Sequence, residues 1–219
     1  MKNYLLVFSF FSTFFINAQE LEAQSSVGTV TSMQDIFTKH LKNSTEQEVS
    51  GSPFLFSSWN NSGVLYYEGN SYALKKLNYN ILSDDIGTLK GVDSVLTYEK
   101  VKIDSFSVSK KMFKKYLDSF YEVLSDGSKT SLLKKYEVSI IDGMFNPIDG
   151  TKEKSRFKIT DDYYKIINND IVKFYPSKKS VLNSFKEYDI EMNKYIKQNK
   201  LSFKKEKDLI QIFDFYNQL

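Results

Sequence analysis

The residue types that usually carry catalysis are scarce in this chain. Its 219 residues contain no cysteine and a single histidine, His40. A serine nucleophile needs a neighbouring base, so a hydrolase triad would have to be built on His40, which lies in a polar segment. We therefore interpret His40 as an ordinary residue of a short helix. Zinc sites rely on His and Cys ligands, so the composition excludes a typical zinc site.

Carboxylates are the remaining candidates for chemistry. Calcium binds oxygen ligands, but no acidic cluster has the alternating spacing of a calcium loop, and aspartates favour turns. A glycosidase needs two carboxylates across a cleft, which sequence spacing does not exclude. No glycine-rich phosphate-binding motif is present. We therefore predict no cofactor and no metal, and name no catalytic or binding residue. The acidic clusters are Asp84–Asp85, Asp142 with Asp149, and Asp161–Asp162.

Aromatic and basic residues suggest binding rather than catalysis. Aromatic side chains on a sheet can stack on a ligand, although they more commonly fill a β core. The chain from Thr151 to Leu219 has 15 basic and 10 acidic residues, a net charge of +5. We interpret its lysines as solvated helix faces and expect no nucleic-acid partner, because the basic stripe lies away from the aromatics. The aromatics are Trp59, Tyr66, Tyr67, Tyr72 and Tyr79; the lysines are Lys178, Lys179, Lys186, Lys194, Lys197, Lys200, Lys204, Lys205 and Lys207.

The elements that would position these residues are strands first and helices last. Short β-forming runs separated by turn signals predict antiparallel strands over 51–175, with hairpins at Gly69-Asn70 and Asn168-Asn169. Alternation at 77–81 predicts a half-buried strand with Asn78 and Asn80 outward, and a change of phase predicts a bulge near Asp104-Ser105. Phe157 and Ile159 form one predicted strand and 163–167 another.

The spacing of apolar residues changes at Pro176. It predicts a helix capped by Ser177, a second over about 187–199 and a third over about 204–217. The fold class is therefore α+β, a predominantly antiparallel β-sheet over 51–175 followed by C-terminal helices over 177–217. The helical region, residues 176–219, should pack on the sheet. One compact unit and two half-domains with a seam near residue 110 both remain open.

The N-terminus has the pattern of an export signal. Lys2 precedes an apolar run of about a dozen residues, and Ala18 is a small residue where a signal peptidase could cut. The run is shorter than the roughly 20 residues that span a bilayer. We predict a signal peptide over 1–18, cleavage between Ala18 and Gln19, and no stable membrane anchor afterwards. Residues 19–50 are predicted to be a flexible leader with a possible short helix over Met33–Leu41.

The chain resembles the uncharacterised secreted proteins of Bacteroidetes-type bacteria. Three stretches carry the resemblance: Ile16–Glu20, Gly51–Leu55 leading to Leu77–Ile81, and Tyr195–Phe203 through Tyr216-Asn217. The resemblance implies a periplasmic or secreted location in a bacterium and brings no known activity.

Three functions follow as expectations. The first is a non-enzymatic binding or interaction module of the cell envelope, with an envelope protein, a glycan or a lipid as partner. The second is a carrier of a hydrophobic ligand such as a lipid, with an apolar pocket under a lid formed by residues 187–219. The third is a carboxylate-based hydrolase, with two acids facing each other in a cleft and one raised pKa.

Overall fold

The computed structural model describes residues 19–20, 28–32, 49–92 and 94–219. The fold is α+β, mostly antiparallel β-sheet followed by C-terminal helices, as predicted. The predicted signal peptide and the predicted helix at Met33–Leu41, with His40, lie outside the described residues.

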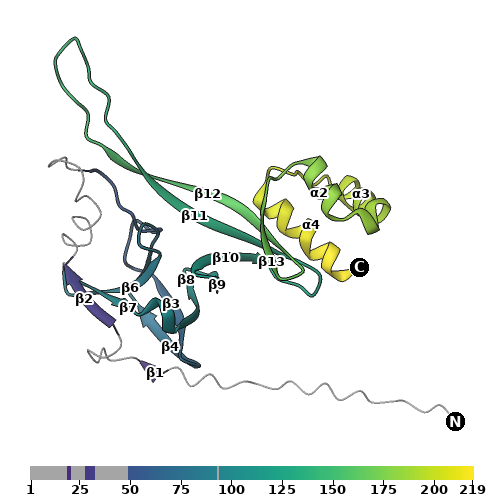
Figure 1. Ribbon diagram of the computed structural model, residues 1–219, viewed down its shortest axis with the longest axis horizontal. Helices are drawn as coiled ribbons and strands as arrows, with labels where there is room; N and C mark the ends of the chain where they lie inside the picture. The colour runs from purple at the N-terminus through teal and green to yellow at the C-terminus, as the bar shows by residue number, and fades with distance from the viewer. Residues whose placement is uncertain (1–18, 21–27, 33–48, 93) are drawn as a thin grey trace.

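The strands form two sheets, both visible in Figure 1. All neighbours are antiparallel except β1 and β4, which are parallel. The nine-stranded sheet has the order β1 (Gln19–Glu20), β4 (Asn70–Lys75), β3 (Ser62–Tyr67), β8 (Ile103–Val108), β9 (Lys111–Tyr116), β10 (Ser119–Ser125), β11 (Ser131–Ile141), β12 (Arg156–Ile167) and β13 (Asp170–Phe174). The four-stranded sheet has the order β2 (Gly28–Ser32), β7 (Ser94–Tyr98), β6 (Asp85–Lys90) and β5 (Leu77–Asn80).

Local sequence signals explain the hairpins and the bulge. The predicted β3–β4 and β12–β13 hairpins are confirmed, and the positive φ of Gly69 and Asn169 closes their turns. The predicted bulge is also confirmed. Tyr66 pairs with Ser105 and Tyr67 with Ile103, which leaves Asp104 as the extra residue.

Three sequence-based expectations differ from the structure. Ordered structure was expected from Gly51, but β1 and β2 lie before it and pair with β4 and β7. The strands predicted at 157–159 and 163–167 are one continuous strand, β12, because it pairs along its whole length with β11. The outward orientation predicted for Asn78 and Asn80 is wrong, since all four residues of β5 are buried.

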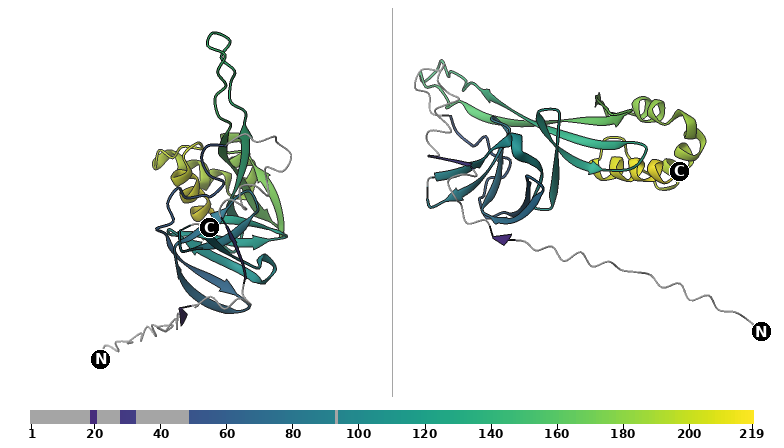
Figure 2. Two further views of the ribbon diagram at one scale, coloured as in Figure 1. Left: turned by 90° about the vertical axis from the view of Figure 1, so that its left-hand side faces the viewer. Right: turned by 60° about the horizontal axis from the view of Figure 1, so that its bottom comes forward.

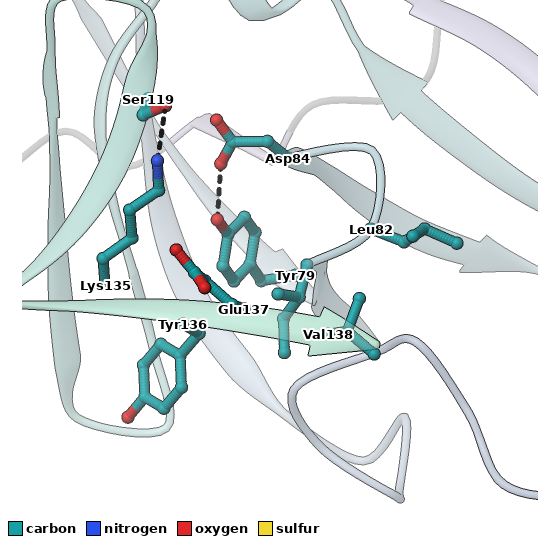
Figure 3. A pocket seen from close by; sticks show the side chains of 9 residues that line it. Tyr79, Leu82, Asp84, Ser119, Lys135, Tyr136, Glu137 and Val138 are labelled. Atoms are coloured by element: carbon teal, nitrogen blue, oxygen red, sulfur yellow. Dashed lines mark hydrogen bonds between the residues drawn. The ribbon is translucent and has the colours of Figure 1, made fainter. Parts of the chain in front are cut away.

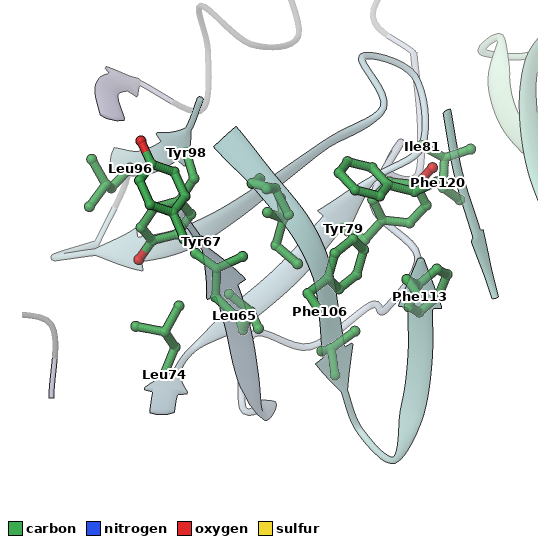
Figure 4. Packing of buried hydrophobic residues seen from close by; sticks show 14 residues of the cluster. Leu65, Tyr67, Leu74, Tyr79, Ile81, Leu96, Tyr98, Phe106, Phe113 and Phe120 are labelled. Atoms are coloured by element: carbon green, nitrogen blue, oxygen red, sulfur yellow. The ribbon is translucent and has the colours of Figure 1, made fainter. Parts of the chain in front are cut away.

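The first core lies between the two sheets and is rich in aromatic rings (Figure 4). Phe106 and Phe113 stack with ring centroids 4.7 Å apart, and Tyr79 lies 5.4 Å from Phe113. Segment 53–56 covers the edge of β5: the Leu55 amide donates to the Tyr79 carbonyl at 2.8 Å, and Asn78 bonds both the amide and the carbonyl of Phe56. Asn78 is therefore buried because its amide group completes this backbone pairing.

The second core lies where three helices pack on the sheet. These are α2 (Lys178–Ser184), α3 (Asp189–Gln198) and α4 (Glu206–Gln218), with the 3-10 turn η2 (Lys186–Tyr188) between α2 and α3. The other 3-10 turn, η1 (Lys100–Lys102), lies between β7 and β8. The Ser177 side chain accepts a hydrogen bond from the Ser180 amide and caps α2, as predicted. The helix predicted over about 204–217 is α4, and Leu209, Ile212 and Phe213 on one of its faces are buried against Leu132 and Phe174.

The two longest strands, β11 and β12, connect these cores and extend beyond them as an arm (Figures 1 and 2). Leu132, near the start of β11, belongs to the second core, whereas Tyr136 and Val138 pack against the first. The base of the arm therefore runs past both cores. The loop at 142–155 is the part of the β11–β12 hairpin that lies farthest from them.

Candidate functional site

A cleft of about 300 Å³ lies at the base of the arm, between the turn that follows β5 and the middle of β11 (Figure 3). Its walls combine apolar and charged side chains, contributed by β5 and its turn, by β10 and by β11. The lining residues are Tyr79, Ile81, Leu82, Asp84, Ser119, Lys135, Tyr136, Glu137 and Val138.

Asp84 is held rigidly at one side of this cleft. Its backbone has φ 56°, a left-handed conformation that aspartate tolerates better than most residues. The Tyr79 hydroxyl and the Phe120 amide both donate to its Oδ1, and Lys100 Nζ lies 2.8 Å from its Oδ2. Burial, together with the Asp84 charge, raises the pKa of Tyr79, so that this hydroxyl stays protonated and acts as a donor.

Lys135 and Glu137 supply opposite charges on the other side. They are two residues apart on β11, so they share one face of the strand. Figure 3 shows both side chains on the side facing Asp84, with Tyr136 pointing away. Lys135 Nζ donates to Ser119 Oγ at 3.2 Å and lies 5.5 Å from the Tyr121 ring centre. Glu137 is solvent-exposed.

Behind the cleft, the opposite face of β11 carries a row of charged and hydroxyl side chains between the two cores. Strand register aligns Glu122, Lys134 and Tyr163 across β10, β11 and β12. Lys111 Nζ and the Tyr136 hydroxyl bond Glu122 at 2.7 and 2.6 Å. Lys134 forms an ion pair with Glu206 of α4, which also accepts a hydrogen bond from the Tyr163 hydroxyl at 3.0 Å. We call these six side chains, Lys111, Glu122, Lys134, Tyr136, Tyr163 and Glu206, the polar seam.

The electrostatics of the seam favour stable ion pairs over proton transfer. Burial and the neighbouring glutamates raise the pKa of Tyr136 and of Tyr163, so both hydroxyls remain donors. Burial acts to raise the pKa of Glu206, but the hydrogen bond and charge of Lys134 outweigh it and lower that pKa. A glycosidase acid requires a raised carboxyl pKa. The seam is therefore a set of satisfied ion pairs and has no such acid at Glu206.

The acidic clusters singled out in the sequence do not come together. Asp84 lies in the turn before β6 and Asp85 is the first residue of β6. Asp142 and Asp149 lie in the arm loop, and Asp161 and Asp162 lie on β12, where Lys173 Nζ is 2.6 Å from Asp162. Only Asp84 lines the cleft. Among the described residues, no group of three or more His, Cys, Asp or Glu side chains is placed to hold a metal ion.

The aromatic candidates are distributed between core and surface. Tyr67 and Tyr79 are buried in the first core, which confirms the interpretation that they fill it. Trp59 makes an edge contact with Phe54 at 4.7 Å. Tyr72 is partly buried against the first core, whereas Tyr66 alternates with the buried Leu65 and Tyr67 and so points to the other face of β3. The five residues therefore present no continuous aromatic face. The nine lysines named from the helical region are all exposed, as expected of solvated faces.

Of the charged and hydroxyl side chains that line the cleft, only Asp84 and Tyr79 were singled out in the sequence. Lys135 and Glu137 lie on β11, Ser119 lies on β10, and Asp84 lies in the turn after β5. Only the register of β10 and β11 and the position of that turn bring them together. The alternation of Lys134, Tyr136 and Val138 with Lys135 and Glu137 was the available signal, since it places charges on both faces of one strand.

The arm loop presents large apolar side chains to solvent. Met144, Phe145 and Ile148 are 76%, 63% and 94% exposed. The loop is ordered by its own hydrogen bonds, including Asn146 N to the Thr151 carbonyl at 2.8 Å and Thr151 N to Asp149 Oδ1 at 2.9 Å.

Comparisons with protein-family models, with curated proteins and with solved structures found no match for this chain. Within the described part of the chain, no helix is long and apolar enough to cross a membrane.

Proposed function

We propose that this protein is a non-enzymatic binding module of the bacterial cell envelope, exported to the periplasm or beyond, with its ligand held in the cleft at the base of the arm. The observation that supports a binding role is the presence of opposite charges around one hollow. Lys135 and Glu137 lie on one side of the cleft, and Asp84 lies on the other. The cleft has a volume of about 300 Å³ and is also lined by Ile81 and Val138.

The charges of the cleft indicate the ligand class. An ammonium and carboxylates that share a small cleft complement a ligand that carries both an anionic and a cationic group, such as a free peptide. Asp84 is already bonded to Tyr79 and Lys100, so Lys135 and Glu137 are the two charges assigned to the ligand. The hydrogen bond from Lys135 to Ser119 reduces the entropy lost on binding, because it orders the lysine side chain beforehand.

The binding proposal is tested by titrating the isotope-labelled protein with trialanine and following the backbone amide NMR signals of Ser119 and Glu137. A second titration uses trialanine acetylated at its N-terminus and amidated at its C-terminus, which lacks both charges. We expect saturable shifts with the free peptide and weaker binding of the blocked one. Lys135→Gln and Glu137→Gln should each weaken binding about two- to fivefold, the value of a partly exposed ion pair.

Lys158→Gln is the matched control, since Lys158 is an exposed lysine further along the same arm. It should leave the titration unchanged. Equal binding of free and blocked trialanine, or an equal effect of all three variants, would contradict the proposed recognition.

Export is tested separately by sequencing the N-terminus of the protein purified from its native host's envelope and culture medium. We expect the mature chain to begin at Gln19. A chain that begins at Met1 and remains in the cytosolic fraction would refute the proposed location.

A further inference from the structure

A second hollow of about 300 Å³ lies where the chain crosses from the nine-stranded sheet to the four-stranded sheet, between β4 and β6. It shares no residue with the cleft at the base of the arm. Its lining residues are Ala73, Leu74, Lys75, Lys76, Thr88, Leu89, Lys90, Gly91 and Tyr98.

The lining of this hollow is strongly basic. Three of its nine residues are lysines, and none of these described lining residues carries a carboxylate. The hollow therefore carries a local positive charge, which attracts an anion. Because Lys75 also interacts elsewhere, Lys76 and Lys90 are the two ammonium groups assigned to the ligand.

The backbone fixes these two lysines on adjacent segments. Leu89 N donates to the Lys76 carbonyl at 3.0 Å, and Leu77 N donates to the Asn61 carbonyl at 3.0 Å. Lys76 has φ 54°, a conformation uncommon for a non-glycine residue, and the hydrogen bonds on either side hold it there. Lys90 follows Leu89 directly, so both side chains start from a hydrogen-bonded part of the sheet.

The hollow also offers neutral contacts. The Thr88 and Tyr98 hydroxyls lie 3.0 Å apart, and both residues are buried. Burial raises the pKa of Tyr98, so its hydroxyl stays protonated and shares a hydrogen bond with that of Thr88. Leu74 and Ala73 supply the apolar wall. Apolar walls with a few converging polar groups are typical of small-molecule sites.

We propose that this hollow binds a small organic anion, with its oxyanion group between Lys76 and Lys90 and its apolar part against Leu74. The volume is at the lower end of the range for ligand pockets, roughly 300–1,000 Å³, so the ligand is small. The expected ligand is therefore an oxyanion joined to a short apolar group. This proposal does not depend on the function assigned to the other cleft.

The test is an NMR titration of the purified protein that follows the backbone amides of Ala73 and Gly91. Three probes are compared at equal concentration: hexanoate, its neutral analogue hexanol, and inorganic phosphate. We expect saturable binding of hexanoate, weaker binding of the other two, and loss of hexanoate affinity as salt screens the lysines. Lys76→Asn and Lys90→Gln should each reduce hexanoate affinity about two- to fivefold.

Asparagine tolerates positive φ, so Lys76→Asn removes the charge without adding backbone strain. Lys110→Asn is the matched control, because Lys110 is also an exposed lysine with positive φ, 69°, in the turn between β8 and β9. It should bind hexanoate as the unchanged protein does. Equal binding of hexanol would overturn the role of charge, and equal binding of phosphate would overturn the assignment to an organic anion. Equal losses in Lys76→Asn and Lys110→Asn would overturn the site itself.

Discussion

Replacing Glu206 by glutamine tests whether the polar seam holds helix α4 on the sheet. The change keeps the size of the side chain and an acceptor for the Tyr163 hydroxyl, but it removes the charge that pairs with Lys134. The Lys134 side chain is 9% exposed, so its ammonium would remain in a poorly solvated position without its closest counterion.

The structure sets the size of the effect. Removing one partner of a buried ion pair costs about 3–5 kcal/mol, whereas an exposed pair contributes about 0.2–1 kcal/mol. Glu206 is 35% exposed, so water can reach its end of the pair. We therefore expect Glu206→Gln to lower the free energy of unfolding by about 1–3 kcal/mol, between these two limits.

The effect should depend on pH in a defined direction. The pKa of Glu206 is lowered from its usual 4.5 in the folded protein, so the charged form is the one that stabilises the fold. This contribution is present above the pKa of the unfolded chain and is lost as the pH falls through the lower folded value. The difference between the unchanged protein and Glu206→Gln should therefore be full at neutral pH and shrink below about pH 4.5.

The assay is urea unfolding followed by circular dichroism at several pH values. Lys134→Met combined with Glu206→Gln should regain most of the lost stability, because the uncompensated charge is gone. Glu187→Gln, at an exposed position of η2, serves as control and should change stability by less than about 0.5 kcal/mol. A loss in Glu206→Gln no larger than this control, or a loss that does not change with pH, would refute the reasoning.

Three further predictions concern packing and the arm. Asn78→Ala should lower the free energy of unfolding by about 1–3 kcal/mol, because it leaves the Phe56 amide and carbonyl unpaired; a loss below about 0.5 kcal/mol in urea unfolding would contradict this. Gly63→Ala should cost about 3 kcal/mol or more, since the new Cβ would lie 1.9 Å from the Ser107 carbonyl oxygen; a soluble variant with unchanged thermal unfolding would show the close approach to be wrong. Replacing the three exposed apolar residues of the arm loop, Met144, Phe145 and Ile148, together by serine should leave the melting temperature unchanged and reduce binding of the dye bis-ANS. An altered melting temperature would mean that these side chains pack in the fold.

Local patterns in the sequence were sufficient for most elements. Alternation and turn residues located the β3–β4 hairpin and the bulge at Asp104, and helical spacing located α4 with its buried face. These features depend on residues close together in the chain, so their signals are short-range.

Burial and the candidate sites could not be predicted in the same way. Asn78 alternates with apolar neighbours, and the pattern therefore placed it outward. It is buried because segment 53–56 covers β5 and uses its side-chain amide. Lys135 meets Ser119 and lies across from Asp84 only through strand register and a turn some 50 residues earlier in the chain. Likewise, Lys76 and Lys90 line one hollow because the chain changes sheets after β4. A single sequence carries no direct signal of such pairings.

The two cores share strands, and this has a consequence for unfolding. Strand β10 contributes Phe120 to the first core and Leu124 to the second, and β11 contributes Tyr136 and Leu132 in the same way. Residue 110, the alternative seam between two half-domains, lies in the tight turn between β8 and β9. Unfolding of β10 and β11 in one core would therefore expose buried side chains of the other core.

We therefore expect one cooperative transition. Trp59, the only tryptophan, packs beside Phe54 near the first core, whereas the helical circular dichroism signal comes mainly from α2, α3 and α4 around the second. In urea, the Trp59 fluorescence and the helical signal should change with the same midpoint and slope, as two-state unfolding requires. If the helical signal were lost first, the shared strands would not couple the two cores. The polar seam would then separate two parts of the protein that unfold independently.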